Sequence, residues 1–271
     1  LANVLTIPQG YKMSKTVLVE EHENWVKLTL NRPEKLNCLN VEMHIALRKA
    51  LEKVESSCSR AILITGSGQG FCAGQDLGER NPDSLEWPPD LRKTLNEYFN
   101  PLIRLITGLK MPVVCAVNGV AAGAGANLAL ACDLTLAAES AKFIQAFSKI
   151  GLVPDAGGSW ILPRRIGYAR AMALALTGDT LSAKEAEKWG LIWKCFSDET
   201  LMKFAEDFTR RFASGPTKAF AYTKLLMQEA SFSSLEEQLE NEARAQQVCG
   251  HSEDYAEGIR AFLQKSSPRF K

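Results

Sequence analysis

Apolar runs that alternate with helical segments constrain the fold of this chain more than any other feature. The runs "RAILITG", "PVVCAVNG" and "LTLAAES" at 60–66, 112–119 and 134–140 are typical of short strands buried on both faces. Helical patterns stand between or beside them, at 41–55, 95–109 and 124–133. Strands that alternate with helices pair in parallel through right-handed crossovers. The pattern therefore predicts an α/β core.

The two ends of the chain differ from this core. Residues 16–33 favour a hairpin with a polar turn at His22 to Asn24. Strand signals stop near residue 197, and Ser234 with Glu237 forms a capping box that opens a late helix. The sequence predicts three parts: a core over 13–197, a helical region over 198–271, and an extension over 1–12 ahead of the first strand.

Composition narrows the class of protein. The chain has 271 residues, 46% hydrophobic and 23% charged, with a formal net charge of +1, as in ordinary globular proteins. No basic run offers phosphate contacts to nucleic acid. The seven cysteines form no Cys-x-x-Cys pair, which disfavours a zinc site or a disulfide framework and is typical of buried thiols in a reducing compartment. With no long apolar span, we expect a cytoplasmic protein without membrane or nucleic-acid partners and without a bound metal.

Two glycine-rich stretches follow predicted strands, at 66–77 ("GSGQGFCAGQDL") and at 118–130 ("NGVAAGAGANLAL"). Such loops let backbone N–H groups approach a ligand closely, and a helix that begins near Ala124 would present free N–H donors to an oxygen that gains negative charge. Neither stretch fits the spacing of a phosphate-binding or dinucleotide-binding motif. Nucleotide hydrolysis and hydride transfer are therefore disfavoured, although a simple tight turn remains an alternative for each loop.

A single acid, Asp155, lies in the apolar stretch "IGLVPDAGGSW" at 150–160. A carboxylate taken out of water is costly unless it is paired, hydrogen-bonded or functional. Asp is also a good N-cap residue, and a helix could open just after it. The sequence leaves both a catalytic and a capping role open.

Four motifs carry a family resemblance: "NRPEKLNCLN", "GFCAGQDL", "VNGVAAGAGANLALACDL" and "FSKIGLVPDAGGSWILPRRIG". Together they resemble the crotonase, or enoyl-CoA hydratase/isomerase, superfamily, in register from about residue 17 to the C-terminus. The resemblance implies a spiral of repeated strand-strand-helix turns and a helical C-terminal region used in trimerisation. It further implies a trimer or a hexamer, an acyl-CoA thioester as substrate, and no cofactor beyond the coenzyme A of that substrate.

The resemblance also assigns roles to residues. The thioester oxygen would sit between the backbone N–H groups of Ala73 and Ala124. The substrate and its CoA portion would be contacted by Lys35, Leu36, Ala73, Gly74, Gln75, Asp76, Leu77, Ala124, Asn127, Phe262 and Lys265. Taken alone, Lys35 is equally typical of a solvated surface lysine. We expect Phe204, Phe208, Phe212 and Phe262 of the helical tail to bury apolar surface between subunits.

The acids discriminate between the reactions of the superfamily. Hydratases of this kind use two glutamates, and this chain has Asn127 and Phe147 at those positions, so it lacks the acid and base that water addition needs. Asp155 stands eight residues after Phe147, where isomerases of ring epoxides bound as CoA thioesters carry their acid. The resemblance therefore implies an isomerase in which Asp155 moves a proton. Asn127 would orient the substrate or Asp155, or be an exposed helix residue.

Other members of the superfamily keep alternatives open. Dihydroxynaphthoyl-CoA synthases and 4-chlorobenzoyl-CoA dehalogenases carry an Asp near this place, but the dehalogenase also needs a histidine base and a tryptophan where Phe147 stands. The three histidines, His22, His44 and His251, are expected to be surface or capping residues. A hydratase that acts on a different acyl-CoA, or a non-catalytic acyl-CoA-binding or RNA-binding relative, also remains possible at this point.

Overall fold

The computed structural model describes residues 15–80, 82–83 and 87–270; the predicted extension at 1–12 lies outside them. The larger sheet has the strand order β1-β2-β3-β5-β7-β10, in which only the β1–β2 pair is antiparallel. Its strands are β1 (Val17–Glu21), β2 (Val26–Leu30), β3 (Ile62–Gly66), β5 (Val113–Val117), β7 (Leu134–Ala138) and β10 (Lys194–Phe196). The predicted hairpin and parallel core are both confirmed.

A second sheet has the order β4-β6-β8-β9, with strands β4 (Gly70–Cys72), β6 (Val120–Ala122), β8 (Lys142–Ile144) and β9 (Thr180–Ser182). Three times in succession, a strand of the larger sheet is followed directly by a strand of the smaller one: β3 by β4, β5 by β6, and β7 by β8. The chain thus winds between two sheets with a helix after each pair of strands. This is the predicted spiral of strand-strand-helix turns.

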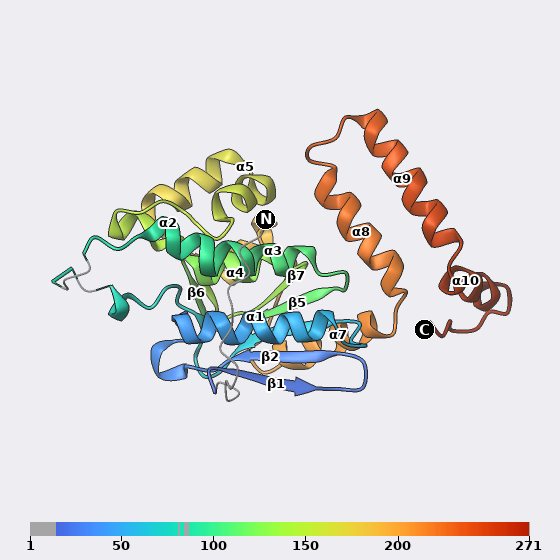
Figure 1. Cartoon of the computed structure of the whole chain (residues 1–271), viewed down its shortest axis with the longest axis horizontal. Coiled ribbons are helices and arrows are strands. Elements are labelled where there is room, and N and C mark those ends of the chain that lie inside the picture. The colour runs from blue at the N-terminus through green and yellow to red at the C-terminus, as the bar shows by residue number, and fades with distance from the viewer. Residues whose placement is uncertain (1–14, 81, 84–86, 271) are drawn as a thin grey trace.

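The helices of the described residues fall into a core group and a protruding group. The core group comprises α1 (Val41–Glu55), α2 (Leu91–Thr94), a π-helical turn (Leu95–Phe99), α3 (Asn100–Gly108), α4 (Ala124–Ala131), α5 (Gly158–Thr177), α6 (Ala183–Trp189) and α7 (Leu201–Ala213). Short 3-10 turns lie at Pro33–Lys35, Leu77–Glu79 and Ala146–Ile150. The remaining helices, α8 (Thr217–Glu229), α9 (Leu235–Gly250) and α10 (Glu253–Leu263), stand apart from the core at the right of Figure 1.

Helix α1 illustrates how local sequence positions the core. The side chain of Asn40 caps its first turn by accepting a hydrogen bond from the N–H of Met43 at 2.9 Å. Its buried face recurs every three to four residues and consists of Met43, His44, Leu47, Leu51 and Val54. This helical spacing is the one read from the sequence, and it packs α1 against β1 and β2.

The phenylalanines expected to lie between subunits differ in where they lie and how exposed they are. Helix α7 packs against β3, β5 and β7, so it belongs to the core although it follows residue 197. Phe208 and Phe212 are packed against that core, whereas Phe262 on α10 is 80% exposed. The segment from α8 to α10 exposes several large apolar side chains, among them Met227, Phe232, Leu235, Tyr255, Phe262 and Leu263. Phe208 and Phe212 thus contact the core of their own chain and are only partly buried there, while Phe204 on α7 is 41% exposed. That these side chains also bury surface between subunits stays a prediction.

All seven cysteines lie in the described residues as free thiols: Cys72, Cys115 and Cys132 are buried and Cys58 is exposed. The expectation of buried thiols therefore holds for only part of the set. No helix among the described residues has the length and apolarity to cross a membrane. Across the same residues, no cluster of three or more His, Cys, Asp or Glu side chains is arranged to hold a metal ion.

Candidate active site

Two backbone segments that lie far apart in the sequence meet at the first turn of α4. Gly74 has a φ of +92°, and a Cβ added to it would lie 2.9 Å from the carbonyl oxygen of Ala122 and 3.6 Å from the nitrogen of Ala124. Only glycine permits so close an approach at this φ. The structure therefore brings together the two glycine-rich stretches that the sequence singled out.

The N–H groups available at this meeting point differ from those expected. Ala124 is the first residue of α4, so its N–H has no acceptor within the helix. The N–H of Ala73, however, donates to the carbonyl oxygen of Leu36 at 3.0 Å and is not free for a thioester. Its assignment as an oxyanion donor is corrected by this bond.

The neighbouring Gln75 offers the donor that Ala73 does not. Leu39 pairs with Gln75 in a parallel bridge, donating to the oxygen of Gly74 at 2.7 Å and accepting from the N–H of Asp76 at 3.0 Å. This pattern turns the N–H of Gln75 away from Leu39, and no acceptor for it exists among the described residues. Sequence spacing could not show which of the two N–H groups, that of Ala73 or that of Gln75, is free. The answer depends on which of them donates to the carbonyl oxygens of the segment from Leu36 to Leu39.

The segment with the expected CoA contacts is tied to this loop. Arg32 binds Asp76 at 2.8 Å and donates to the carbonyl oxygen of Cys38 at 2.7 Å. Asp76 also caps the 3-10 turn that begins at Leu77, and Arg32 holds the pKa of its carboxyl below the ordinary value. Lys35 is exposed and Leu36 is 41% exposed, so both side chains remain available to a ligand.

Asp155 does not cap a helix. The N-cap of α5 is Gly157 and makes no side-chain cap hydrogen bond; it is the backbone carbonyl of Asp155 that accepts from the N–H of Gly158, at 2.8 Å. The carboxyl oxygen Oδ1 is buried and has no hydrogen-bond partner among the described residues. Burial raises the pKa of Asp155 to about 6, with no charged neighbour contributing. The capping interpretation is therefore wrong.

Asn127 links α4 to the Asp155 segment. It is fully buried, and its Nδ2 donates to the carbonyl oxygen of Asp155 at 2.8 Å. Ala124 and Asn127 are three residues apart and share one face of α4, so Asp155 lies beside the same helical turn that presents the Ala124 N–H. The alternative of an exposed polar helix position for Asn127 is wrong.

Phe147 keeps this corner of the site apolar. It is buried in the 3-10 turn Ala146–Ile150, and a Cβ added to Gly123 would lie 3.6 Å from its ring. Gly123 is the N-cap of α4, so the ring stands beside the first turn of that helix. At the position of the second hydratase acid, the chain thus presents a ring that exchanges no protons.

Three residues lie elsewhere than the sequence suggested. Phe262 and Lys265 belong to the α10 end of the chain, where α10 packs on α9, far from α4 in Figure 1. Within one chain they do not join the site. His44 is buried against Phe99 rather than at the surface, and burial lowers its pKa to about 4.

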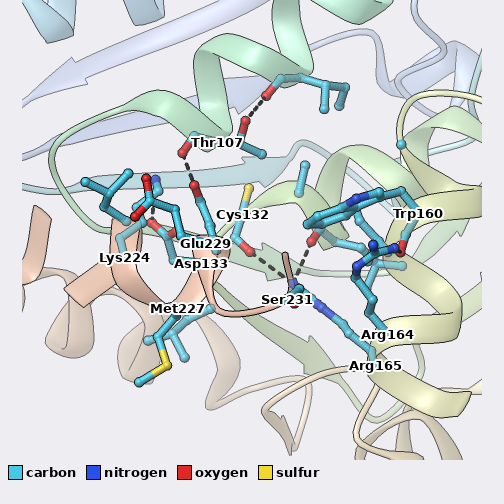
Figure 2. A pocket seen from close by; sticks show the side chains of 18 of the residues that line it. Thr107, Cys132, Asp133, Trp160, Arg164, Arg165, Lys224, Met227, Glu229 and Ser231 are labelled. Carbon is cyan, nitrogen blue, oxygen red and sulfur yellow. Dashed lines mark hydrogen bonds and ion pairs between the residues drawn. The ribbon is translucent and has the colours of Figure 1, made fainter. Parts of the chain in front are cut away.

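A cavity of about 1100 Å³ is lined by residues of α3, α4, α5 and α8 and of the segments next to them. Figure 2 shows Trp160 and Arg164 of α5 on one side of it, and Lys224 of α8 bound to Asp133 at 3.0 Å on the other. Asp155, Ala124 and Gln75 are not among its lining residues. This cavity is therefore formed where α8 leaves the core, and the chemically distinctive groups lie outside it.

Fold and site together define a member of the enoyl-CoA hydratase/isomerase family, whose sequence model matches residues 20–271. The chain belongs to this crotonase family and is an enzyme of it, acting as an acyl-CoA isomerase or hydratase. It is 49% identical to the 1,2-epoxyphenylacetyl-CoA isomerase of Escherichia coli K12, over 95% of this chain and 99% of the relative.

Two further similarities are to proteins named as enoyl-CoA hydratases. A "Probable enoyl-CoA hydratase" of Rhodobacter capsulatus is 45% identical over 94% of this chain and 97% of its own length. The crystal structure of an enoyl-CoA hydratase from Polaromonas sp. JS666 matches with a TM-score of 0.87 at 34% identity, covering 94% of this chain and 99% of that one. Relatives named as isomerases and as hydratases are thus both close, and the reaction has to be argued from the site.

Proposed function

We propose that the protein is an acyl-CoA isomerase that uses Asp155 to move a proton, with 1,2-epoxyphenylacetyl-CoA as substrate and the ring-expanded oxepin-CoA as product. The observation that carries this is the carboxyl of Asp155 beside the first turn of α4: its Oδ1 is buried without a hydrogen-bond partner among the described residues, and burial raises its pKa to about 6. A base poised near neutral pH is suited to proton transfer. The 49% identity to an enzyme of that name supports the choice of substrate.

The proposed mechanism uses an enolate. The Asp155 carboxylate removes a proton from the carbon next to the thioester, and the charge moves onto the thioester oxygen. The N–H groups of Gln75 and Ala124 would hold that oxygen, each contributing about 2.7 to 4 kcal/mol to the transition state. The carbon–carbon bond shared by the epoxide and the six-membered ring breaks, which leaves the oxygen within a seven-membered ring, and the same carboxyl returns the proton to a carbon further along the conjugated system. No atom is gained or lost.

Water addition is disfavoured by the same residues. The Nδ2 of Asn127 donates to the carbonyl oxygen of Asp155, and the buried side chain of Phe147 has no titratable group. Hydration requires both an activated water and a proton donor for the second carbon. The site supplies one acid, which suits a shift of one proton within the substrate.

A panel of acyl-CoA thioesters in deuterated water tests the proposal. The panel contains the epoxyphenylacetyl thioester, several unsaturated acyl-CoAs and crotonyl-CoA, and mass spectrometry follows deuterium incorporation and products. We expect exchange next to the thioester, conversion of the ring epoxide to its isomer, and almost no hydration. Hydration of crotonyl-CoA at about 10 per second or faster would identify a hydratase instead.

We also propose that the chain assembles into a closed trimer or hexamer through α8 to α10. Large apolar side chains are exposed on these helices, among them Met227 at 73%, Leu235 at 71% and Phe262 at 80%. Surfaces of this kind are usually covered by a partner. In such an assembly Phe262 and Lys265 could reach the CoA bound to a neighbouring copy. Light scattering at micromolar concentration would contradict this assembly if it found a stable monomer.

A further inference from the structure

We propose that Asn127 and Gln145 are positioning residues: together they form an amide relay that fixes the main chain at Asp155 and thereby aims its carboxyl at the substrate. The inference deepens the proposed function and rests on Asp155 being the proton carrier. Gln145 is in none of the motifs that pointed to the site. It follows β8 and is 3% exposed.

The relay consists of two hydrogen bonds in series. The Nε2 of Gln145 donates to the Oδ1 of Asn127 at 2.9 Å, and the Nδ2 of Asn127 donates to the carbonyl oxygen of Asp155 at 2.8 Å. A backbone carbonyl can only accept, so Asn127 must turn its NH₂ toward Asp155 and its oxygen toward Gln145. Gln145 must then present its own NH₂. The direction of both amides is therefore fixed by the carbonyl of Asp155.

The end of the relay shows that this orientation comes at a cost. With its NH₂ committed to Asn127, Gln145 leaves its Oε1 buried and without a hydrogen-bond partner among the described residues. Unsatisfied buried acceptors are rare, because each loses its hydration without replacement. The orientation imposed by the carbonyl of Asp155 therefore leaves one hydrogen-bonding group of the relay unsatisfied.

The backbone after Asp155 needs such support. Ala156 has a φ of +47° and Gly157 a φ of +82°, so two consecutive residues adopt the left-handed region, the first of them without being glycine. Residues in this region cost free energy and persist where surrounding contacts hold them. The carbonyl of Asp155 is held from two sides, by Asn127 and by the N–H of Gly158 at 2.8 Å. These two bonds fix the turn that begins at Asp155.

Gly158 allows the relay to approach the turn so closely. A Cβ added to Gly158 would lie 2.3 Å from Nδ2 and 2.8 Å from Oδ1 of Asn127. Real Cβ atoms do not approach so closely, so any other residue here would have to displace the amide of Asn127. The amide of Asn127 therefore lies directly against the start of α5.

The relay also carries no charge. Two neutral amides hold the segment without adding an electrostatic contribution, so burial remains the main cause of the raised pKa of Asp155. A carboxylate in either place would put a second negative charge beside the proton carrier. An amide pair thus fixes geometry while leaving the acid to titrate by itself.

The test compares Gln145→Met and Asn127→Ala with a matched control, Thr135→Val. Met keeps the length of Gln145 and removes its hydrogen bonds. Thr135 is buried and donates to the carbonyl of Ala129 on α4 at 2.9 Å, so its loss removes the same kind of bond from the same helix, away from Asp155. The readouts are kcat and KM for isomerisation, and the titration of the Asp155 carboxyl by ¹³C NMR, assigned by difference from Asp155→Asn.

For both relay variants we expect kcat to fall roughly ten- to a hundredfold with KM nearly constant, because small misplacements of a catalytic group have effects of that size. We expect the pKa of Asp155 to move from about 6 toward the ordinary aspartate range, since a loosened turn admits water. Thr135→Val should change neither readout.

Two results would overturn the inference: relay variants with wild-type kcat and an unmoved Asp155 titration, or a control that loses as much kcat as they do. Failure of the proposed function is recognised separately. If Asp155→Asn kept full isomerisation, Asp155 would not be the proton carrier, whereas the NMR titration would still report whether the relay positions its carboxyl.

Discussion

Asp76 and Asp155 each stand at the start of a turn beside the same site, and their surroundings are opposite. Asp76 is bound by Arg32 at 2.8 Å and accepts from the N–H of Gly78 at 3.0 Å. Its pKa is lowered, chiefly by Arg32. Asp155 has no charged partner, one of its oxygens is buried and unpaired, and its pKa is raised to about 6 by burial.

The difference separates a structural carboxylate from a chemical one. Asp76 stays ionised at every physiological pH, and it fixes the loop between β4 and the Leu77–Glu79 turn. Asp155 can take up and release a proton near neutral pH, which a paired carboxylate cannot do easily. Replacing each residue by Asn, with nearly the same shape, is the sharpest way to examine this contrast.

The largest expected effect is the loss of isomerisation in Asp155→Asn. The substitution keeps the size of the side chain and removes its basicity, and general-base catalysis contributes about 10²- to 10⁴-fold. The N–H groups of Gln75 and Ala124 belong to the backbone, so binding of acyl-CoA should stay nearly intact. The measurement is kcat by product formation together with Kd by calorimetry. Turnover above about a tenth of the wild-type value would remove Asp155 from the mechanism.

The next effect is a pH dependence set by Asp155. Only the ionised carboxylate accepts a proton, so with a pKa of about 6 in the free enzyme kcat/KM should be constant above about pH 7. Below pH 6 it should fall about tenfold per pH unit, as the ionised fraction does. Asp76, whose pKa is already lowered, adds no limb in this range. A flat profile of kcat/KM between pH 5 and 7 would contradict the role of the Asp155 carboxylate as the base.

The two aspartates also show what a sequence can and cannot predict. Strands, helices and the hairpin followed from periodicity, because those patterns report which face of an element is buried. The family motifs pointed to Asp155, Ala124 and Asn127 together. Neither source could tell that Ala73 donates to Leu36, since that depends on one hydrogen bond between segments 37 residues apart in the chain.

The role of Gln145 could not be predicted from the sequence either. A lone glutamine after a strand is ordinarily a surface residue, and nothing in its neighbourhood suggests a partner 18 positions away on α4. Its role depends on Asn127 facing the carbonyl of Asp155, and hence on where α5 begins. Tertiary contacts of single side chains of this kind leave no periodic signal in the sequence.

A smaller effect is expected for the stability of Asp76→Asn. The change removes a half-buried ion pair and leaves the Arg32 guanidinium with neutral acceptors. For a pair with limited exposure, the free energy of unfolding should fall by about 1 kcal/mol at neutral pH. The loss should shrink in acid, because a lowered pKa gives stability that is present above the unfolded pKa and disappears as pH falls through the folded one. Thermal denaturation at pH 7.5 and at about pH 2 measures it, since the folded pKa lies below 3.8; an unchanged Tm at pH 7.5 would show the pair to be dispensable.

The smallest and most discriminating effect is a gain of stability in Asp155→Asn. Because the folded pKa of about 6 lies above the unfolded value near 3.8, the unfolded chain ionises first as pH rises, and wild-type stability falls between these two values. Above pH 6 the ionised Asp155 lowers the free energy of unfolding by at most about 3 kcal/mol. An Asn never ionises and avoids this loss, although its own unpaired amide offsets part of the gain. Asp155→Asn should therefore raise Tm by a few degrees at pH 7.5 and leave it unchanged below pH 4. The sign is opposite to that of Asp76→Asn, so equal losses from both substitutions at pH 7.5 would show that the carboxyl of Asp155 stabilises the fold as Asp76 does.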